Sequence, residues 1–258
     1  MTGPQANRET ETEGLAALSH RFGSGAVTPP QRARFVRELF DRIAPRYDLM
    51  NDLMSLGLHR LWKRTMVNAA ADAMMDLEGD IIDLAGGTGD IAALLRARLP
   101  DQSITIADTS PGMLAVARKR LGDTVAYVET PAEALPFASQ QAALVTLAFG
   151  LRNMTDPARV LAEVARVLKP GGCLLLLEFS RASAWFNPAY QLHSRFVIPA
   201  LGAAVAGDRR AYRYLIESIR QFPDAASISA ELVAAGFGAI AVRRFMFGVA
   251  ALHSARKL

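Results

Sequence analysis

Apolar residues recur at helical spacing through residues 31–76, before any pattern typical of strands begins. Two groups carry this spacing: Phe35, Leu39, Phe40 and Ile43, then Leu58, Leu61, Trp62 and Met66. Such spacing predicts amphipathic helices. Pro45 should end the first of them, because proline lacks the backbone N–H that continues a helix. We therefore expect a cap of two or three helices ahead of a sheet.

Short apolar runs then alternate with helical segments. The predicted strands cover residues 80–84, 103–108, 125–129, 142–149 and 173–179, and the predicted helices cover 91–99, 112–121 and 157–168. Asp156 is a suitable cap for the last helix, Pro157 suits its first turn, and Lys169-Pro170-Gly171-Gly172 should end it. Near-continuous apolar strands between helices predict a parallel sheet that is covered on both faces.

The C-terminal part of the pattern predicts how the sheet closes. A final helix over 227–235, stopped by Gly236, precedes apolar segments near 239–242 and 247–252, which we expect to form an antiparallel pair. The predicted fold is thus α/β, with a doubly wound and mostly parallel sheet of seven strands. Residues 31–258 form one predicted domain, interrupted at 181–223 by an insertion long enough to act as a lid. Residues 1–30, rich in Gly, Thr, Glu and Ser, are predicted to be a flexible tail.

Composition and charge narrow the setting. Hydrophobic residues make up 51% of the 258 positions, and the single cysteine, Cys173, excludes a disulfide within the chain, so a cytoplasmic location is the default. The longest apolar stretch, residues 196–207, is too short to span a bilayer. From Arg181 onward, ten basic residues stand against four acidic ones. This excess suits an anionic membrane surface, and a solvated basic face explains it equally well. No aromatic RNA-binding motif accompanies it, so we expect no nucleic-acid partner, and no Cys, His or Asp spacing predicts a metal site.

A glycine-rich string follows the first predicted strand and carries the candidate chemistry. It reads Asp83-Leu84-Ala85-Gly86-Gly87-Thr88-Gly89-Asp90, and Asp108 ends the next strand 21 residues after Gly87. Glycines let the backbone approach a ligand closely, and a carboxylate at this distance can accept hydrogen bonds from ribose hydroxyls. The combination predicts a ligand that contains a nucleoside.

The acidic residues of this string distinguish between nucleotide ligands. A dinucleotide fingerprint places a pyrophosphate at the helix N-terminus, where Asp83 and Asp90 would repel it. Both carboxylates suit a cation, and S-adenosylmethionine is a phosphate-free cation that carries a ribose, so we favour it over NAD. Ligands of such sheets bind at the carboxyl ends of the strands. One crevice should therefore gather Asp83, residues 86–89, Asp108, residues 131–132 and residues 149–153.

Longer strings give the chain a family resemblance. They are Phe40-Asp41-Arg42-Ile43-Ala44-Pro45-Arg46-Tyr47-Asp48, Phe149-Gly150-Leu151-Arg152-Asn153, Arg166-Val167-Leu168-Lys169-Pro170-Gly171-Gly172, Leu177-Glu178-Phe179-Ser180 and Tyr212-Arg213-Tyr214-Leu215. With the glycine string, they are similar to motifs of the ubiquinone/menaquinone biosynthesis C-methyltransferases, a family of S-adenosylmethionine-dependent enzymes with a Rossmann-like fold. The likeness runs from about residue 40 to residue 257.

The resemblance implies a reaction and a setting. The implied reaction is methylation of a ring carbon of a polyprenyl benzoquinol or demethylmenaquinol, with S-adenosylmethionine as the methyl donor. The implied partners are a lipophilic quinol and a membrane surface, and the implied location is the cytoplasm with peripheral attachment at the inner membrane face; a homodimer is left open. Two alternatives remain, a diverged paralogue with another aromatic acceptor and a non-catalytic, cofactor-binding scaffold of a quinone-biosynthesis assembly. Apolar residues of the predicted lid would receive the isoprenoid tail or form the lid's own core: Trp185, Phe186, Tyr190, Phe196, Val197 and Ile198.

The resemblance also implies which residues bind the cofactor. These are Asp83, Gly86, Gly87, Thr88, Gly89, Asp108, Thr109, Pro131, Ala132 and Ala148. Pro131 stands where the family usually has an Asp or Asn that contacts adenine. Because proline offers neither a side-chain acceptor nor an amide proton, adenine recognition should rest on the backbone amide of Ala132 or on stacking.

The implied catalytic residues are Arg152, Asn153 and Tyr47. A quinol carbon becomes nucleophilic when a ring hydroxyl loses its proton, and the pKa of a phenol is about 10. Arg152 could stabilise the phenolate electrostatically, but it cannot accept the proton, because guanidinium does not deprotonate in proteins. A water held by Arg152, Asn153 and Tyr47 is the expected base. The structural alternatives are that Arg152 pairs with Asp156 across a turn and that Tyr47 anchors the helical cap.

Overall fold

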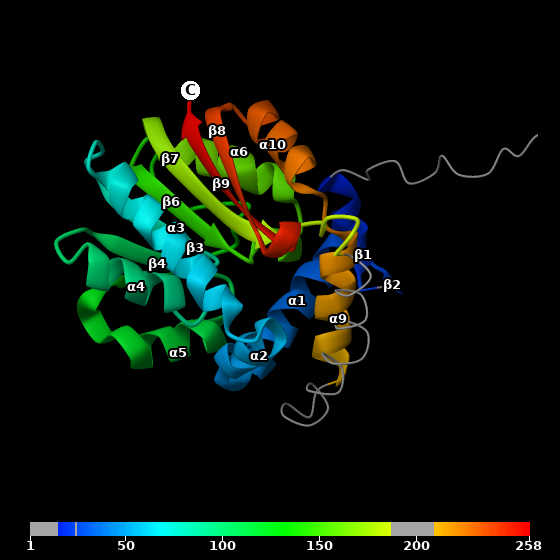
Figure 1. Ribbon diagram of the computed structural model, residues 1–258. Helices are drawn as coiled ribbons and strands as arrows, with labels where there is room; N and C mark the ends of the chain where they lie inside the picture. The colour runs from blue at the N-terminus through cyan, green and yellow to red at the C-terminus, as the bar shows by residue number, and fades with distance from the viewer. Residues whose placement is uncertain (1–14, 24, 187–208) are drawn as a thin grey trace, which may run out of the picture.

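The computed structural model describes residues 15–23, 25–186 and 209–258. Among these residues, seven strands form one sheet in the order β5-β4-β3-β6-β7-β9-β8 (Figure 1). The strands are β3 (Asp80–Leu84), β4 (Ile104–Asp108), β5 (Ala126–Glu129), β6 (Ala142–Ala148), β7 (Leu168–Phe179), β8 (Phe237–Phe245) and β9 (Ala250–Lys257). β9 runs antiparallel to both of its neighbours, and the other described pairings of this sheet are parallel. The prediction of a mostly parallel, seven-stranded sheet closed by an antiparallel pair is confirmed.

Helices bury the central strands on both faces. α3 (Leu58–Met74), α4 (Asp90–Arg98) and α5 (Pro111–Leu121) share one core with the sheet, while α6 (Pro157–Val167) and α10 (Ala225–Ala234) share the other (Figure 1). β6 and the middle of β7 are buried along their length, which explains their unbroken apolar sequence. α6 begins as predicted, because the Asp156 side chain accepts a hydrogen bond from the Arg159 backbone N–H at 3.0 Å.

The predicted helical cap consists of α1 (Pro29–Ile43), the 3₁₀ turn η2 (Ala44–Arg46) and α2 (Tyr47–Ser55), followed by α3. α1 ends two residues before Pro45, as expected. The cap packs against α5 and against α9 (Arg209–Gln221), which belongs to the predicted lid insertion. Their shared apolar cluster contains Val36, Leu39, Met113, Tyr214 and Leu215. Of the insertion at 181–223, residues 187–208 lie outside the described residues, and with them Tyr190, Phe196, Val197 and Ile198.

The prediction of a flexible tail over residues 1–30 is wrong for the part that the structure describes. η1 (Leu15–His20) is followed by a short hairpin of β1 (Arg21–Phe22) and β2 (Gly25–Ala26). Leu15 and Leu18 are buried in the core beside α6, so their apolar area holds the segment in place. Two leucines in a polar stretch were too weak a pattern to predict this packing. Residues 1–14 lie outside the described residues.

Candidate active site

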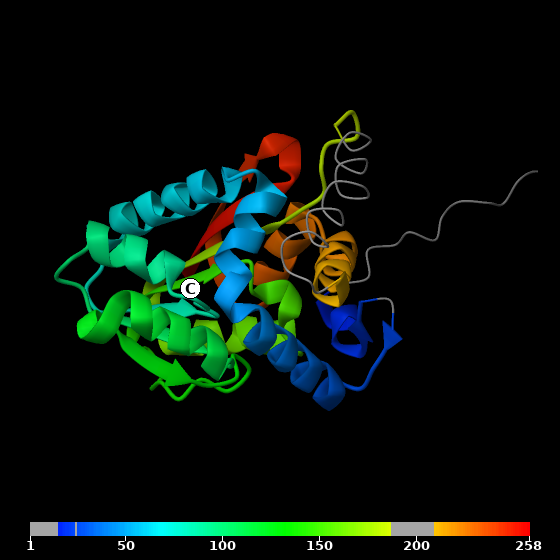
Figure 2. The same cartoon turned by 90° about the horizontal axis from the view of Figure 1, so that it is seen from below.

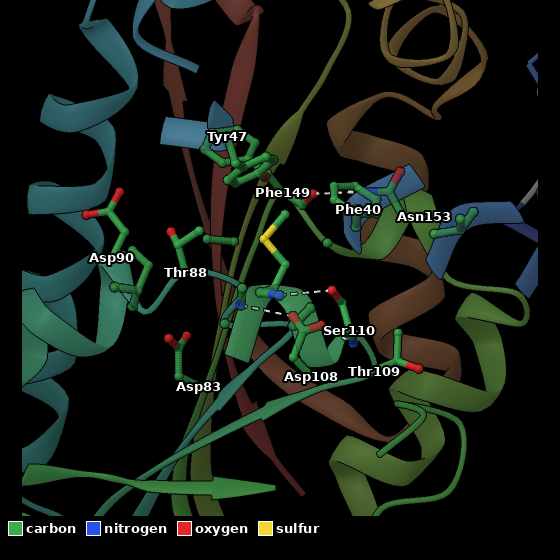
Figure 3. Close-up of a pocket in the computed structure, with 18 of the residues that line it drawn as sticks. Phe40, Tyr47, Asp83, Thr88, Asp90, Asp108, Thr109, Ser110, Phe149 and Asn153 are labelled. Carbon is green, nitrogen blue, oxygen red and sulfur yellow. Dashed lines mark hydrogen bonds between the residues drawn. The ribbon is translucent and has the colours of Figure 1, made fainter. Parts of the chain in front are cut away.

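The carboxyl ends of β3, β4 and β6 open into a cavity of about 790 Å³, including the space at its mouth. In Figure 3, Asp83 and Asp108 lie toward one end of this cavity and Tyr47 and Phe149 toward the other. The predicted site residues that line it are Tyr47, Asp83, Gly86, Gly87, Thr88, Asp108, Thr109, Ala148 and Asn153.

A second cavity of about 490 Å³ adjoins the first and shares Asp108, Thr109 and Asn153 with it. Its lining includes Pro131 and Ala132. Because Asp108 lines the same cavity, Pro131 and Ala132 lie on the Asp108 side of the site. Pro131 is exposed and Ala132 is buried. Gly89 and Arg152 line neither of the two cavities.

The glycine string forms the tight turn between β3 and α4. Gly87 (φ 55°) and Gly89 (φ 75°) adopt left-handed conformations that glycine tolerates best. At Gly86, a Cβ atom would lie 2.7 Å from Oδ2 of Asp83, so only glycine fits beside that carboxylate. At Gly89, a Cβ would lie 3.0–3.2 Å from the side chains of Leu121, Ala117 and Ile106. Gly89 therefore serves helix packing, and Gly86 and Gly87 shape the cavity.

Asp108 ends β4 and ties the glycine turn to the next loop. Its Oδ2 accepts a hydrogen bond from the backbone N–H of Gly87 at 2.9 Å, and its Oδ1 accepts one from the backbone N–H of Ser110 at 2.8 Å. Burial raises the pKa of Asp108 to about 6, although these backbone donors act to lower it. A carboxylate has about four acceptor positions, so Asp108 can still accept hydrogen bonds from ligand hydroxyls in the cavity that it lines.

Asp83 is a buried carboxylate with one oxygen left over. It is 1% exposed, and its Oδ1 accepts a hydrogen bond from the Thr146 hydroxyl at 2.7 Å. Its Oδ2 has no hydrogen-bond partner of good geometry among the described residues, although the nearby backbone N–H of Ala92 acts to lower the pKa of the carboxyl. Burial raises the pKa of Asp83 to about 7. Because an unpartnered buried carboxylate oxygen is costly, a cationic group in the cavity would supply the missing partner.

Asp90 does not add a free negative charge to this loop, contrary to the sequence argument. Its Oδ2 lies 2.6 Å from Nζ of Lys63, whose side chain is 7% exposed. Burial acts to raise the pKa of Asp90, but the Lys63 ammonium outweighs it, and the pKa is lowered. The preference for a cationic ligand therefore depends on Asp83. No local pattern predicts this contact of Lys63 with Asp90, since only the fold brings α3 beside the start of α4.

Thr88 joins the glycine string to the helical cap. Its hydroxyl donates a hydrogen bond to Oδ1 of Asp48 in α2 at 2.8 Å, and Asp48 also forms an ion pair with Arg120 of α5. Thr88 lines the cavity as predicted, but its hydroxyl proton is engaged by the protein. These contacts fasten α2 across one side of the cavity.

Asn153 belongs to the 3₁₀ turn η4 (Leu151–Asn153), at the end of β6, and lines both cavities. Its Oδ1 accepts a hydrogen bond from the buried Tyr214 hydroxyl of α9 at 3.1 Å. Its Nδ2 donates to the carbonyl oxygen of Phe149 at 3.3 Å. The Asn153 amide is thus oriented by Tyr214, which lies 61 residues later in the sequence.

Arg152 lies behind this cavity wall. Its side chain is 3% exposed, and its guanidinium donates to Oε1 of Glu178 at 2.7 Å and to the carbonyl oxygen of Phe149 at 2.5 Å. The Arg152 Nε has no hydrogen-bond partner among the described residues. The alternative pairing with Asp156 is wrong, because Asp156 caps α6.

A second buried arginine holds η4 from the cap side. Arg32 of α1 is 2% exposed and donates to the carbonyl oxygens of Leu18, Arg152 and Asn153 at 2.7, 2.8 and 3.1 Å. Two guanidinium groups therefore hold η4: Arg152 forms an ion pair with Glu178, and Arg32 lies within electrostatic reach of Glu133. Burial lowers the pKa of Arg32 and raises that of Tyr214, so the tyrosine stays neutral.

Arg32, Lys63, Glu178 and Tyr214 are the buried polar residues that sequence reasoning missed as parts of the site. Glu178 and Tyr214 stand in the strings that carry the family resemblance, but neither string reveals a contact with η4. No signal identifies Arg32, which lies in an ordinary amphipathic helix. Within the described ranges, no group of three or more His, Cys, Asp or Glu side chains is placed to hold a metal ion.

Comparisons with known proteins find similar sequences along nearly the whole chain. The model of the ubiE/COQ5 methyltransferase family matches residues 28–257. The chain is 46% identical over 236 residues to the ubiquinone/menaquinone biosynthesis C-methyltransferase UbiE of Rubrivivax gelatinosus, with 92% of each chain covered. It is 44% identical to the UbiE of Bordetella parapertussis over 262 aligned positions, which cover the full length of both.

Solved structures with less similar sequences share the fold. One is an S-adenosylmethionine-dependent methyltransferase of Thermotoga maritima, a possible histamine N-methyltransferase, with a TM-score of 0.61 and 20% identity over 86% of this chain and all of that one. Another is the CurJ carbon methyltransferase, with a TM-score of 0.59 and 15% identity over 90% of this chain and 72% of that one. At such identities the likeness concerns the fold alone.

Proposed function

The chain belongs to the ubiE/COQ5 methyltransferase family, and from this premise we propose that it transfers a methyl group from S-adenosylmethionine to a ring carbon of a polyprenyl benzoquinol or demethylmenaquinol. The reaction belongs to ubiquinone/menaquinone biosynthesis, as the names of its relatives indicate for those proteins. The substrate is a lipophilic quinol.

The unpartnered carboxylate oxygen of Asp83 is the observation that carries the cofactor assignment. S-adenosylmethionine has an ammonium and a sulfonium group, and Asp83 would bind this cationic end. Asp108 would accept hydrogen bonds from the ribose hydroxyls, and the adjoining cavity beside Pro131 and Ala132 would take the adenine. When bound, the cofactor supplies an electrophilic methyl group.

Tyr47, Phe149 and Asn153 are proposed to hold the acceptor ring. Phe149 offers an aromatic wall, and Tyr47 and Asn153 offer hydrogen-bonding groups that line the cavity. Tyr47 and Asn153 would hold the water that takes the proton of the ring hydroxyl. Arg152 is proposed to act from behind Asn153, where its buried guanidinium and the neighbouring Arg32 would favour the phenolate electrostatically.

The proposed location is the cytoplasm, with peripheral attachment to the inner face of the membrane, where a polyprenyl quinol is dissolved. None of the described helices combines the length and the apolar character needed to cross a bilayer. Attachment would therefore depend on surface residues. The protein would work there as a monomer or as a homodimer.

Transfer of label tests the proposed function directly. The purified protein is incubated with methyl-labelled S-adenosylmethionine and reduced demethylated quinones, beside Asp108→Ala and the matched control Asp101→Ala, which changes an exposed aspartate. We expect label in the quinone ring for the wild type and the control, and strongly reduced cofactor binding for Asp108→Ala. Binding without transfer to any quinol would support the scaffold alternative, and neither binding nor transfer would refute the proposal.

A further inference from the structure

Five large apolar side chains are exposed beside the cavity, and we call them the apolar rim. They are Leu56 (72% exposed), Leu61 (56%), Trp185 (69%), Met246 (38%) and Phe247 (53%). They belong to the α2–α3 junction, to the segment that follows β7 and to the 3₁₀ turn η6 (Met246–Gly248) between β8 and β9. Figure 2 shows these three segments on the same side of the molecule, at the top of that view.

Aromatic contacts connect the apolar rim to the cavity. Trp62 of α3 stacks on Phe245, immediately before η6, with ring centroids 5.9 Å apart. The same Trp62 ring lies 6.4 Å from the ring of Phe149, which lines the cavity. Trp62 and Phe245 therefore connect the proposed quinol-binding wall at Phe149 to the start of η6.

Three members of the rim adopt a backbone conformation that their side chains disfavour. Leu56 (φ 51°), Met246 (φ 45°) and Phe247 (φ 56°) lie in the left-handed region. Bulky residues rarely adopt this conformation, which glycine or asparagine would occupy at lower cost. Strain at exposed apolar residues is not explained by core packing, and such strain is concentrated at functional positions.

The rim is ordered although it is exposed. The Phe247 ring packs on Trp185 and Phe186 with centroid distances of 4.6 and 5.0 Å. The backbone N–H and the hydroxyl of Ser183 both donate to the carbonyl oxygen of Phe247, at 2.7 and 2.8 Å. These contacts fix the aromatic side chains in an arrangement that a partner can meet without further ordering.

We propose that the apolar rim inserts into the interface of an anionic lipid bilayer, so that the cavity receives its substrate from the membrane. This inference rests on the proposed function, in which the substrate is a lipophilic quinol. Trp and Phe side chains favour the membrane interface. The exposed Arg181, Arg243 and Arg244 flank the rim in sequence and supply the charge that anionic headgroups attract.

A lipid surface suits the shape of the rim better than a second copy of this chain. The rim residues come from three separate turns and not from one continuous helix or sheet face. A stable protein interface needs about 800 Å² on each partner with close shape complementarity, whereas turn tips can insert singly into a fluid bilayer. The basic flanks would also repel their own copy.

Vesicle sedimentation tests the inference. The vesicles contain equal amounts of phosphatidylglycerol and phosphatidylethanolamine, and the variants are Trp185→Ser and Phe247→Asn. Each should weaken membrane partitioning by about tenfold, the effect of keeping one large apolar side chain in water. The matched control is Met75→Ser, at the opposite end of α3, where the side chain is 83% exposed; its partitioning should equal that of the wild type.

Phe247→Asn provides a second readout with the opposite sign. Asparagine tolerates the left-handed conformation, so this variant should unfold at a higher temperature than the wild type while it binds vesicles less tightly. A purely structural role for Phe247 predicts loss of thermal stability instead. Equal vesicle binding by wild type and both rim variants would overturn the inference, and so would a homodimer that only the rim variants disrupt.

A water-soluble acceptor separates this inference from the proposed function. Transfer to a short-chain demethylated quinol in vesicle-free buffer should proceed at similar rates in the wild type and in Phe247→Asn. A wild type that methylates this quinol but does not bind vesicles refutes the membrane surface alone. A wild type that binds vesicles but methylates no quinol refutes the proposed function alone.

Discussion

At Asp83, the protein keeps a carboxylate where its charge is unfavourable until a ligand arrives. One oxygen is satisfied by Thr146, the other has no partner among the described residues, and the pKa rises to about 7 through burial. Such an arrangement lowers the stability of the ligand-free protein, and a bound cation would offset this loss by pairing with the carboxylate. The same residue therefore makes cofactor affinity depend on pH.

We expect the affinity for S-adenosylmethionine to fall by about tenfold between pH 8 and pH 6. With a pKa of about 7, Asp83 is mostly protonated at the lower pH. The free energy needed to ionise it then reduces the net binding free energy of the cofactor. Asp83→Asn should bind roughly ten- to hundredfold more weakly at pH 8, because a charged hydrogen bond is lost. Calorimetric titration at both pH values measures each effect. An equally steep pH dependence in Asp83→Asn would assign it to another group.

Arg152 lies in a buried ion pair with Glu178. Substituting Arg152 therefore changes the stability of the protein as well as the charge near the cavity. Arg152→Ala leaves Glu178 buried without its partner, so the free energy of unfolding should fall by about 3–5 kcal/mol. The double variant Arg152→Met/Glu178→Met removes both charges and should recover much of this stability. Chemical denaturation compares the variants. If the double variant is folded and binds cofactor but still turns over slowly, the lost turnover of Arg152→Ala is electrostatic in origin. Recovered turnover in the double variant would contradict an electrostatic role for Arg152.

At the scale of elements, η4 is a short turn held by two helices from distant parts of the sequence. α1 supplies Arg32 to its carbonyl oxygens, and α9 supplies Tyr214 to the Asn153 side chain. A turn of three residues has little stability of its own. The position of Asn153 therefore depends on the cap and the lid insertion as much as on the sheet.

Tyr214→Phe should lower turnover by about two- to tenfold, because it removes one hydrogen bond that orients Asn153. Affinity for S-adenosylmethionine should stay within about twofold, since Tyr214 lines neither cavity. Steady-state kinetics and cofactor titration separate the two quantities. Tyr127→Phe is the matched control, because the Tyr127 hydroxyl donates to Gly122 away from the site. An equal loss of turnover in both variants would argue for general destabilisation.

At the scale of the whole molecule, buried titratable groups act on stability in opposite directions. Asp83 and Asp108 have raised pKa values, so the folded state binds more protons than the unfolded state between about pH 4 and pH 7, and stability falls as pH rises there. Burial lowers the pKa values of His59 and His253. Their contribution has the opposite sign, because stability is lost as pH falls below the unfolded value of 6.5.

The difference between wild type and Asp83→Asn isolates one of these groups. Relative to the variant, the wild type should lose a few kcal/mol of unfolding free energy as pH rises from 4 to 7, since one pKa unit corresponds to about 1.4 kcal/mol. Denaturant unfolding at several pH values measures this difference. If it does not change with pH, Asp83 does not carry the raised pKa.

Much of the sheet could be predicted from the sequence, and the polar interior of the site could not. Unbroken apolar runs predict strands such as β6, and Asp156 with Pro157 predicts the start of α6, because these signals are local in the sequence. The partners of Asp90, Arg152 and Asn153 are Lys63, Glu178 and Tyr214, which are 25 or more residues away along the chain. The predicted positions of Asp83 and Asp108 at strand ends followed from topology alone, whereas their neighbours required the packed structure.

The contacts of Arg32 with η4 and with the segment before α1 affect the order in which the chain can fold. Leu15 donates its backbone N–H to Glu231 at 3.4 Å, and Gln221 donates to the carbonyl oxygen of Gly23 at 3.0 Å. The segment before α1 thus finds its partners only after the ribosome has made almost the whole protein. Closing such long loops is slow. In pulse-labelled hydrogen exchange during refolding, we expect the amides of residues 151–153 to become protected after those of β3 and β4.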